Sequence, residues 1–237
     1  MTGTLINIAA ILIGGSLGLA FGARLPERMR QTLVSGLGLF TLVMGVRMFF
    51  DSQNALVVVA SLLVGGLLGE WWRIEDGLAA VGRRLEARFA AGNQQVARGQ
   101  RFMRGFLTSS LLFCVGPMTI LGSIQDGLTG DFNLLAIKSV LDGFAALAFA
   151  STLGVGVLFS VLVVLVYQGG ITLLAAQAEA LLSEPMVAEM SAVGGVLLVG
   201  LAIGSLLELR PIRTGNLLPA LLIAPLIVAL LSALGLG

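Results

Sequence analysis

The sequence predicts an all-α polytopic membrane helix bundle, with about eight transmembrane helices in one membrane domain spanning residues 1–237. Of the 237 residues, 57% are hydrophobic and only 11% are charged, whereas soluble domains carry roughly 25% charged residues. The apolar residues also gather into stretches of about 20, the length that a helix needs to cross the hydrocarbon core. Because so few polar groups cannot cover a globular surface, lipid must solvate most of this protein.

Eight apolar stretches are candidate spans, and we expect the first to be a retained helix. It lacks the preceding basic region and the cleavage site that a signal peptide would have. The fifth and sixth stretches would form a helix of roughly 65 Å if they were continuous, about twice the bilayer core, so the chain must turn within residues 151–156. The stretches are Thr4–Gly22, Thr32–Phe50, Ala55–Gly69, Gly105–Gly122, Phe132–Ala150, Val157–Ala175, Ser191–Leu207 and Leu217–Leu236.

The basic residues predict the orientation of the bundle. With eight spans and the N-terminus outside, three of the 14 basic residues fall in the first cytoplasmic loop, seven in the second and two in the last. The outer loops carry acidic residues and no basic one, which is the positive-inside pattern. This pattern predicts an even number of spans with both termini outside, although a re-entrant fourth segment would change the count. The outer acidic residues would be Asp51, Asp126, Asp131, Glu179, Glu184 and Glu189.

The second cytoplasmic loop, residues 70–104, is the only sizeable segment that we expect outside the membrane. Its apolar residues recur at spacings of three and four, which predicts an amphipathic helix. Trp71 and Trp72 precede this helix at the expected membrane boundary, where indole rings prefer to lie. The sequence leaves open whether the helix lies on the inner leaflet or packs beneath the bundle. Its apolar stripe would consist of Ile74, Leu78, Val81, Leu85 and Phe89.

The glycine pattern is compatible with an inverted repeat. Paired glycines at residues 14–15 precede a glycine-containing segment at 35–38, and paired glycines at 169–170 precede a similar segment at 191–195. This spacing would relate spans one to three to spans six to eight. Because the two units are an odd number of spans apart, they would be inverted in the membrane, as in many secondary transporters.

The fourth segment contains the first candidate for a functional site. Gly116 and Pro117 would break or bend a membrane helix, because proline removes a backbone hydrogen bond and clashes with the preceding turn. Irregular backbone at membrane depth is tolerated inside protein or beside a water-filled cavity. Ser123, Gln125 and Asp126 follow the break with oxygen atoms that suit a hard cation or a proton relay. The alternative for Gly116 and Pro117 is a purely structural kink. The alternative for the polar residues after them is a solvated outer loop.

Lys138 and Asp142 are ionisable residues within the fifth apolar stretch. They are four residues apart and therefore share one face of a helix, and Asp142 would lie roughly 15 Å into the span, near the bilayer midplane. The pair could carry an ion, or it could only fix helix packing. Pairing is expected in both cases, because a lone buried charge is costly. Gln168, which lies beside two glycines, could mark a second helix break.

The residues that the chain lacks narrow the range of functions. It contains no histidine, which excludes His-based catalysis and disfavours a transition-metal site. Cys114 is the single cysteine, so no intrachain disulfide can form, and its apolar neighbours indicate a buried hydrophobic residue. No phosphate-binding loop, catalytic carboxylate pair or nucleophile motif is visible in the sequence. We therefore expect no enzyme activity, no cofactor, no metal and no nucleic-acid partner.

Several blocks of this sequence resemble the YqgA-like family of bacterial inner-membrane proteins, a family defined by a domain of unknown function. The resemblance extends over essentially the whole chain and implies a multi-pass protein of the bacterial inner (cytoplasmic) membrane. It implies no substrate and no activity. The blocks are GPMTILGSIQDG at 116–127, KS at 138–139 with LDG at 141–143, YQGG at 167–170 and GNLLPA at 215–220.

The leading functional hypothesis is a transporter or channel for a small ion or small solute, lined by the break in the fourth segment, Asp142 and Gln168. The alternative is a membrane scaffold that holds partners or lipids through its cytoplasmic loop, and an intramembrane enzyme is weaker because catalytic motifs are missing. The partners would be the lipid bilayer and a small ion or solute, and the sequence is compatible with a homo-oligomer. A polar cavity at Asp142 would favour transport, whereas a dry and tightly packed core would favour the scaffold.

Overall fold

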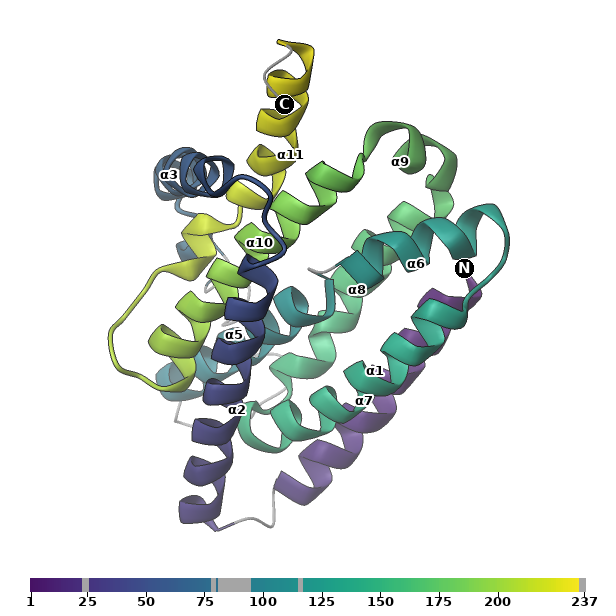
Figure 1. Cartoon of the computed structure of the whole chain (residues 1–237). Helices are drawn as coiled ribbons and strands as arrows, with labels where there is room; N and C mark the ends of the chain where they lie inside the picture. The colour runs from purple at the N-terminus through teal and green to yellow at the C-terminus, as the bar shows by residue number, and fades with distance from the viewer. Residues whose placement is uncertain (23–25, 78–79, 81–94, 115–116, 235–237) are drawn as a thin grey trace.

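Helices and the short segments that connect them make up the described part of the chain. The computed structural model describes residues 1–22, 26–77, 80, 95–114 and 117–234, and no strand occurs among them (Figure 1). The all-α fold class that the sequence predicts is therefore confirmed. The elements are α1 (Thr2–Gly22), α2 (Glu27–Phe49), α3 (Ala55–Trp72), α5 (Gln95–Cys114), α6 (Pro117–Leu128), α7 (Asn133–Leu153), α8 (Gly156–Leu173), α9 (Ala175–Leu181), α10 (Glu184–Leu201), the π-helix η1 (Ala202–Leu206), the 3-10 helix η2 (Thr214–Leu217) and α11 (Ala220–Ala233).

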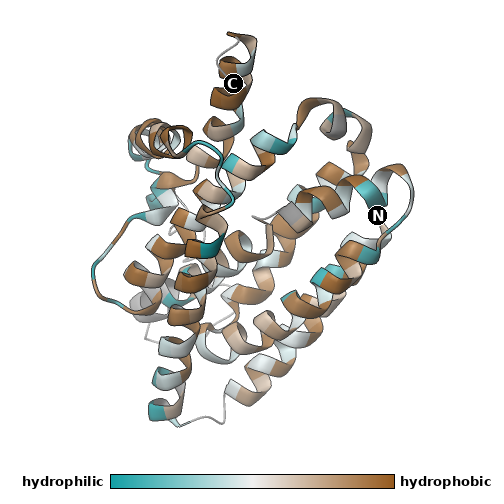
Figure 2. Ribbon diagram, in the orientation of Figure 1, coloured by the Kyte–Doolittle hydropathy of each residue, from teal (hydrophilic) through white to brown (hydrophobic). Residues whose placement is uncertain are grey.

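Within the described residues, seven helices are long and apolar enough to cross a membrane, and α5 with α6 would add an eighth crossing. Hydrophobic residues dominate most of the helical ribbons, and hydrophilic residues form short bands on some of them, such as α6 and α7, as well as parts of the loops (Figure 2). Large apolar side chains also lie on the outside of the bundle, where Leu56, Leu67 and Val166 are 78%, 75% and 76% exposed. Apolar surface of this extent is the surface that acyl chains solvate.

The helices α1 and α7 run side by side and in the same direction (Figure 1). Gly14, Gly18 and Gly22 of α1 all face the backbone of α7. A Cβ atom added to Gly14 would lie 2.1 Å from the carbonyl oxygen of Gly143, and one added to Gly18 would lie 2.2 Å from the carbonyl oxygen of Leu147. Glycines spaced four apart form a strip without side chains, so the two backbones can approach closely.

Other helix pairs are held by similar close contacts. Along the contact between α2 and α10, Gly45 packs on Gly195 and Gly38 packs on Leu207. Residue numbers therefore fall along α2 where they rise along α10. These two helices are therefore antiparallel, and so are α3 and α11, whereas α5 and α6 run parallel to α8. The contacts that establish the last two directions are Gly65 with Ala220, Gly69 with Asn216, Gly105 with Val157 and Gly127 with Thr172.

These directions agree with eight crossings. Successive crossings alternate in direction, so the parallel helices α1 and α7 must be separated by an even number of crossings. This condition holds if α5 and α6 together cross the membrane once, which makes α7 the fifth crossing. A fourth segment that returned to its starting side would make α7 antiparallel to α1. The packing therefore favours a spanning fourth segment over a re-entrant one.

The chain turns between α7 and α8 inside the predicted segment 151–156. The helix α7 ends at Leu153, and Gly154 has a φ of 84°, a left-handed conformation that glycine adopts without steric cost. The next helix begins at Gly156. A single glycine therefore divides what would otherwise be an overlong apolar helix.

The structure corrects the expected position of Glu189. The sequence places this residue in an outer loop, but α10 begins at Glu184 and Glu189 is buried within it, with 1% of its surface exposed. Its carboxylate accepts hydrogen bonds from the backbone N–H groups of Gln53 and Asn54, both at 2.7 Å, and from the hydroxyl of Ser52 at 2.8 Å. These donors precede α3, so Glu189 satisfies backbone amides at the start of that helix.

Two expectations remain predictions. The proposed amphipathic helix of the 70–104 loop depends on residues 78–79 and 81–94, which lie outside the described residues. At the two ends of that loop, α3 extends to Trp72 and α5 begins at Gln95. The inverted repeat is likewise not established, although the opposite directions of α1–α3 and of α8, α10 and α11 are compatible with it.

The glycine strip generates a stability prediction. We expect Gly18→Ala to lower the free energy of unfolding by about 1–3 kcal/mol, because the new methyl group would overlap the α7 backbone and force the helices apart. Thermal unfolding in detergent measures the effect. Gly36→Ala is the matched control, since no atom lies within 4 Å of a Cβ added there and alanine favours the helix by roughly 1 kcal/mol. Equal melting temperatures for the two variants would contradict the close packing of α1 and α7.

The direction of the crossings generates a topology prediction. Cysteine placed at position 184 should react with a membrane-impermeant thiol reagent on intact cells, whereas cysteine at position 95 should react only after permeabilisation. Both variants are made in a Cys114→Ala background, which removes the single native cysteine. The reverse pattern of labelling would overturn the orientation that the arginines predict.

Candidate functional site

A group of buried polar side chains lies where α1, α7 and α8 meet, and we call it the polar cluster. Each member is at most 6% exposed, although all three helices are apolar enough to span a membrane. Burying so many polar groups is unfavourable unless they bond to one another. The polar cluster consists of Thr4 and Asn7 of α1, Lys138 and Asp142 of α7, and Gln168 and Thr172 of α8.

The centre of the polar cluster is Asp142. Its Oδ2 atom forms an ion pair with the ammonium group of Lys138 and accepts a hydrogen bond from it. The two residues lie one turn apart on α7. The same oxygen accepts a hydrogen bond from Nδ2 of Asn7 at 3.0 Å. The structure therefore brings together the two charged residues that the sequence predicts as a pair, and adds an amide from a helix far away in the chain. A carboxylate with two donors is well stabilised even without water.

Amide and hydroxyl groups extend the polar cluster from Asp142 to the neighbouring helix. The Nδ2 group of Asn7 also donates to Oε1 of Gln168 at 3.0 Å, and Nε2 of Gln168 donates to the hydroxyl of Thr4 at 3.2 Å. The hydroxyls of Thr4 and Thr172 are 3.3 Å apart. The Oδ1 atom of Asn7 has no hydrogen-bond partner among the described residues, although Asn7 is fully buried. The Oδ1 atom of Asn7 is therefore a buried acceptor in the polar cluster that the described residues leave unused.

The structure separates the residues that the sequence assigns to the fourth segment. Asp126 is buried and accepts a hydrogen bond from the backbone N–H of Gly3 at 3.1 Å, and its Oδ2 atom is 2.9 Å from the amino group of Met1. Gln125 instead faces the outside of the bundle, and the hydroxyl of Ser123 donates to the Thr119 carbonyl of its own helix at 2.6 Å. Asp126 thus lies at the N-terminal end of α1. Gln125 and Ser123 do not join the polar cluster.

The predicted break in the fourth segment is only partly within the described residues. Gly116 lies outside them, and Pro117 begins α6. The helical segments on the two sides, Arg101–Cys114 and Met118–Leu128, are inclined by 59°. The prediction that Gly116 and Pro117 expose carbonyls to a polar space therefore stays a prediction.

The predicted helix break at Gln168 is wrong. The helix α8 continues from Gly156 through Gly169 and Gly170 to Leu173. A Cβ added to Gly169 would be 3.6 Å or more from its neighbours, and one added to Gly170 would contact nothing within 4 Å. These glycines do not interrupt the helix, and Gln168 joins the polar cluster through its side chain alone.

A second set of polar groups was not singled out from the sequence. Thr108, Ser109 and Ser110 are consecutive buried residues of α5, and their hydroxyls have no hydrogen-bond partner among the described residues. Successive residues of a helix point about 100° apart, so protein surrounds α5 on several sides at this level. The signal in the sequence is a run of three hydroxyl residues within an apolar stretch.

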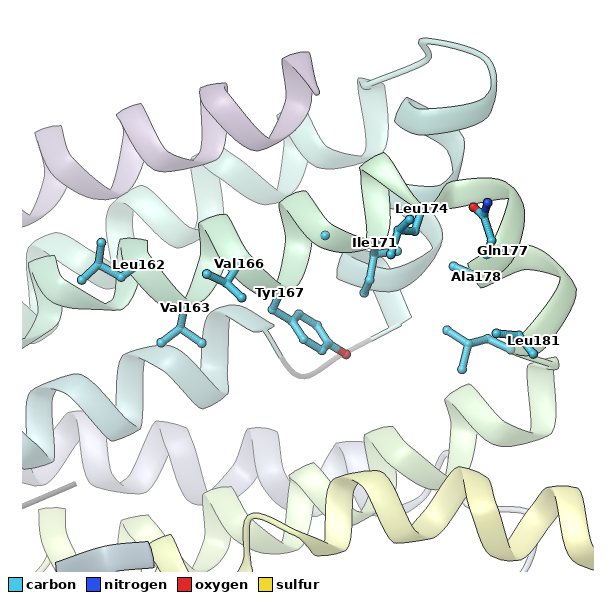
Figure 3. A pocket seen from close by; sticks show the side chains of 11 residues that line it. Leu162, Val163, Val166, Tyr167, Ile171, Leu174, Gln177, Ala178 and Leu181 are labelled. Atoms are coloured by element: carbon cyan, nitrogen blue, oxygen red, sulfur yellow. The ribbon is translucent and has the colours of Figure 1, made fainter. Parts of the chain in front are cut away.

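Two cavities lie beside α8, and both are mainly apolar. A groove of about 880 Å³ follows α8 and α9, and its lining includes Tyr167 and Leu181 (Figure 3). A second cavity of about 320 Å³ lies deeper between α5, α8, α10 and α11 and shares Val163 and Tyr167 with the groove. Asp142 lines neither of them. The second cavity does reach Cys114, a buried residue of α5.

A separate polar group ties α3 to the segment before α11. The side chain of Asn216 accepts a hydrogen bond from the backbone N–H of Glu75 at 2.8 Å and donates one to Glu70 at 2.5 Å. The Glu75 carboxylate accepts the backbone N–H of Gly215 at 3.0 Å, and Arg213 forms an exposed ion pair with Glu70. Partial burial raises the pKa of the Glu75 carboxyl above its ordinary value.

The fold and the site define the class of this molecule: a polytopic membrane protein with a charged and polar group inside its helix bundle. The chain belongs to a protein family of unknown function, the DUF554 family, whose model matches residues 2–229. The resemblance to YqgA-like proteins is thereby confirmed.

Two bacterial relatives match nearly their whole length. The uncharacterised membrane protein YdfK of Bacillus subtilis (strain 168) is 30% identical over 240 residues, which covers 100% of this chain and 99% of the relative. The uncharacterised protein YqgA of Escherichia coli (strain K12) is 34% identical over 222 residues, which covers 94% of each chain. No solved structure matches the chain. The comparisons therefore establish the family and support a location in a membrane.

The raised pKa of Glu75 generates a pH prediction. A carboxyl whose pKa is higher in the folded state favours folding below its unfolded pKa, and this contribution is lost as pH rises through the folded pKa. We therefore expect Glu75→Gln to melt at a higher temperature than wild type at neutral pH, with the difference vanishing as the pH falls below the ordinary glutamate range. Thermal unfolding against pH measures it. Glu184→Gln, at an exposed position, is the matched control, and equal pH profiles for Glu75→Gln and wild type would contradict the prediction.

Proposed function

We propose that this protein is a transporter or channel of the bacterial inner membrane that moves a small ion or small solute and is not an enzyme. The observation that carries the proposal is the Lys138–Asp142 ion pair, which is buried among helices that lipid surrounds and is continuous with amides and hydroxyls of two other helices. Ionisable residues at membrane depth are costly, and they mark ion or substrate pathways by default.

Helix packing alone does not account for the polar cluster. The contact between α1 and α7 is already fixed by the glycine strip, where Gly14 and Gly18 meet the α7 backbone without any polar side chain. A buried ion pair usually contributes little net stability, and well-packed apolar residues often replace it without loss. A role in function explains why charges are kept at this place.

The positions of the polar residues support a route through the bundle. Asp126 lies beside the start of α1, and the polar cluster follows along α1, α7 and α8. The hydroxyls of Thr108 and Ser109, which have no hydrogen-bond partner in the described part of the chain, lie on α5, on the cytoplasmic side of Cys114 in the predicted orientation. Polar groups are thus distributed along the predicted direction of transport.

The alternative function is a membrane scaffold, and one observation favours it. The two cavities beside α8 are mainly apolar, and neither is lined by Asp142. A transporter closed on both sides and a static scaffold would share this feature. Only a measurement of flux separates the two functions.

The proposal is tested by reconstituting the full chain into liposomes. Flux of protons, alkali cations, divalent cations and small anions is measured for wild type, Asp142→Asn and the double variant Lys138→Met/Asp142→Leu, with melting temperatures recorded in parallel. We expect wild type to carry at least one of these species, and Asp142→Asn to fall to the level of empty liposomes while remaining folded. The double variant should fold at least as stably as wild type, because apolar residues replace a buried ion pair, and it should also lack flux.

Asp131→Asn is the matched control, because it neutralises an exposed carboxylate at the start of the same helix. Its flux should equal that of wild type. Undiminished flux in Asp142→Asn would remove Asp142 from the mechanism. Absence of flux for every species tested with wild type would favour the scaffold.

A further inference from the structure

We propose that the cavity of about 320 Å³ between α5, α8, α10 and α11, which we call the deep cavity, binds a small neutral molecule that enters from the lipid bilayer through the groove. The ligand has an apolar body and an oxygen atom that hydrogen-bonds to Ser110. This inference goes beyond the proposed function, because no member of the polar cluster is among the described residues that line the deep cavity.

The walls of the deep cavity are suited to a small apolar molecule. They consist mainly of leucine and aromatic side chains, among them Phe106, Leu107, Tyr167 and Leu221. Sites for small molecules typically measure about 300–1,000 Å³ and have walls of this composition. The volume of about 320 Å³ is at the lower end of this range, so it fits a molecule built on a single ring. Apolar cavities favour such molecules over water.

Ser110 adds a hydrogen-bonding group to these walls. Its side chain is buried, and its hydroxyl has no hydrogen-bond partner among the described residues. Other buried serines donate to a carbonyl of their own helix, as Ser61 and Ser139 do at 2.6 Å. A buried polar group without a partner is costly. Since a serine hydroxyl turns about a single bond, Ser110 can bond to an oxygen atom of a molecule in the deep cavity.

Two further polar groups of the deep cavity are also uncharged. Tyr167 lines both the deep cavity and the groove, and its ring projects away from α8 (Figure 3). A phenol both donates and accepts hydrogen bonds, and the thiol of the buried Cys114 is a weak donor. The polar part of the site therefore suits an oxygen atom that accepts a hydrogen bond.

The charge of the walls selects a neutral ligand. Among the described residues, no charged side chain lines the deep cavity or the groove. An ion that entered would lose its water without gaining a counter-charge, which is very unfavourable in a medium of low dielectric constant. A neutral molecule needs partners only for its few polar atoms. The site therefore excludes anionic lipid headgroups and inorganic ions.

The groove gives the deep cavity access to lipid. The two spaces adjoin at Val163 and Tyr167, which line both and lie one turn apart on α8. The groove opens to the outside of the bundle, because Val166, Leu174 and Leu181 in its lining are exposed. Since α8 is long and apolar enough to cross a membrane, lipid covers this side. A molecule dissolved in the bilayer therefore reaches the deep cavity without passing through water.

Photolabelling of the full chain in lipid nanodiscs tests the inference. The probe is a benzyl alcohol that carries a diazirine on its ring, and mass spectrometry of peptides locates the labelled residues. We expect labelling within residues 106–114 and 218–222, and an excess of unlabelled benzyl alcohol should suppress it. Labelling of α3, where Leu56 and Leu67 face outward, reports the background from lipid and should not be suppressed. Labelling of the deep cavity that is absent or not suppressed would overturn the inference.

A benzoic acid with the same ring and diazirine tests the selection for a neutral ligand. Its carboxylate is ionised at neutral pH and would find no counter-charge among the described walls of the deep cavity. Labelling of the deep cavity is divided by labelling of α3 for each probe, which corrects for unequal partition into lipid. We expect a ratio at least tenfold lower for the acid than for the alcohol. Equal ratios would contradict the proposed site.

Ser110→Ala tests the hydrogen bond to the ligand. We expect the concentration of benzyl alcohol that halves the labelling to rise about fivefold, because one hydrogen bond is lost. Ser109→Ala is the matched control, since its hydroxyl is also buried without a partner among the described residues but does not line the deep cavity. This control should match wild type. The same value for Ser110→Ala and Ser109→Ala would refute the role of Ser110, and melting temperatures show whether both variants fold.

The labelling experiments do not measure flux, so their outcome is independent of the liposome experiments. Suppressible labelling in a protein without flux would leave the site in place and favour the scaffold function. Flux that depends on Asp142, without labelling of the deep cavity, would support transport and overturn the site. The comparison of the two probes on wild type decides the matter where a variant does not fold.

Discussion

The close approach of α1 and α7 is the contact on which the site depends. Gly14 and Gly18 remove the side chains that would hold the two backbones apart, and Gly143 does the same on α7. Asn7 lies on the buried side of α1 together with these glycines. Because the backbones nearly touch, the short Asn7 side chain reaches both Asp142 and Gln168 at 3.0 Å. A bulkier α1 surface would leave the ion pair without its third partner.

The parts of the fold that the sequence predicts are those that local physics determines. The apolar stretches identify the spans because lipid selects for length and hydrophobicity, and Lys138 with Asp142 forms a predictable pair because residues four apart share a helix face. The turn at Gly154 follows from the impossible length of an uninterrupted helix. Each of these inferences needs only neighbouring residues.

The parts that the sequence does not predict are contacts between distant segments. Asn7 meets Asp142 across 135 positions and Gln168 across 161, and nothing local selects these partners. Glu189 shows the same limit, because counting charges places it in a loop while the structure uses it to bind the amides before α3. A carboxylate can be buried where it accepts hydrogen bonds from backbone N–H groups that lack another partner. Which N–H groups a carboxylate can reach depends on how the helices pack, and the sequence around the carboxylate does not contain that information.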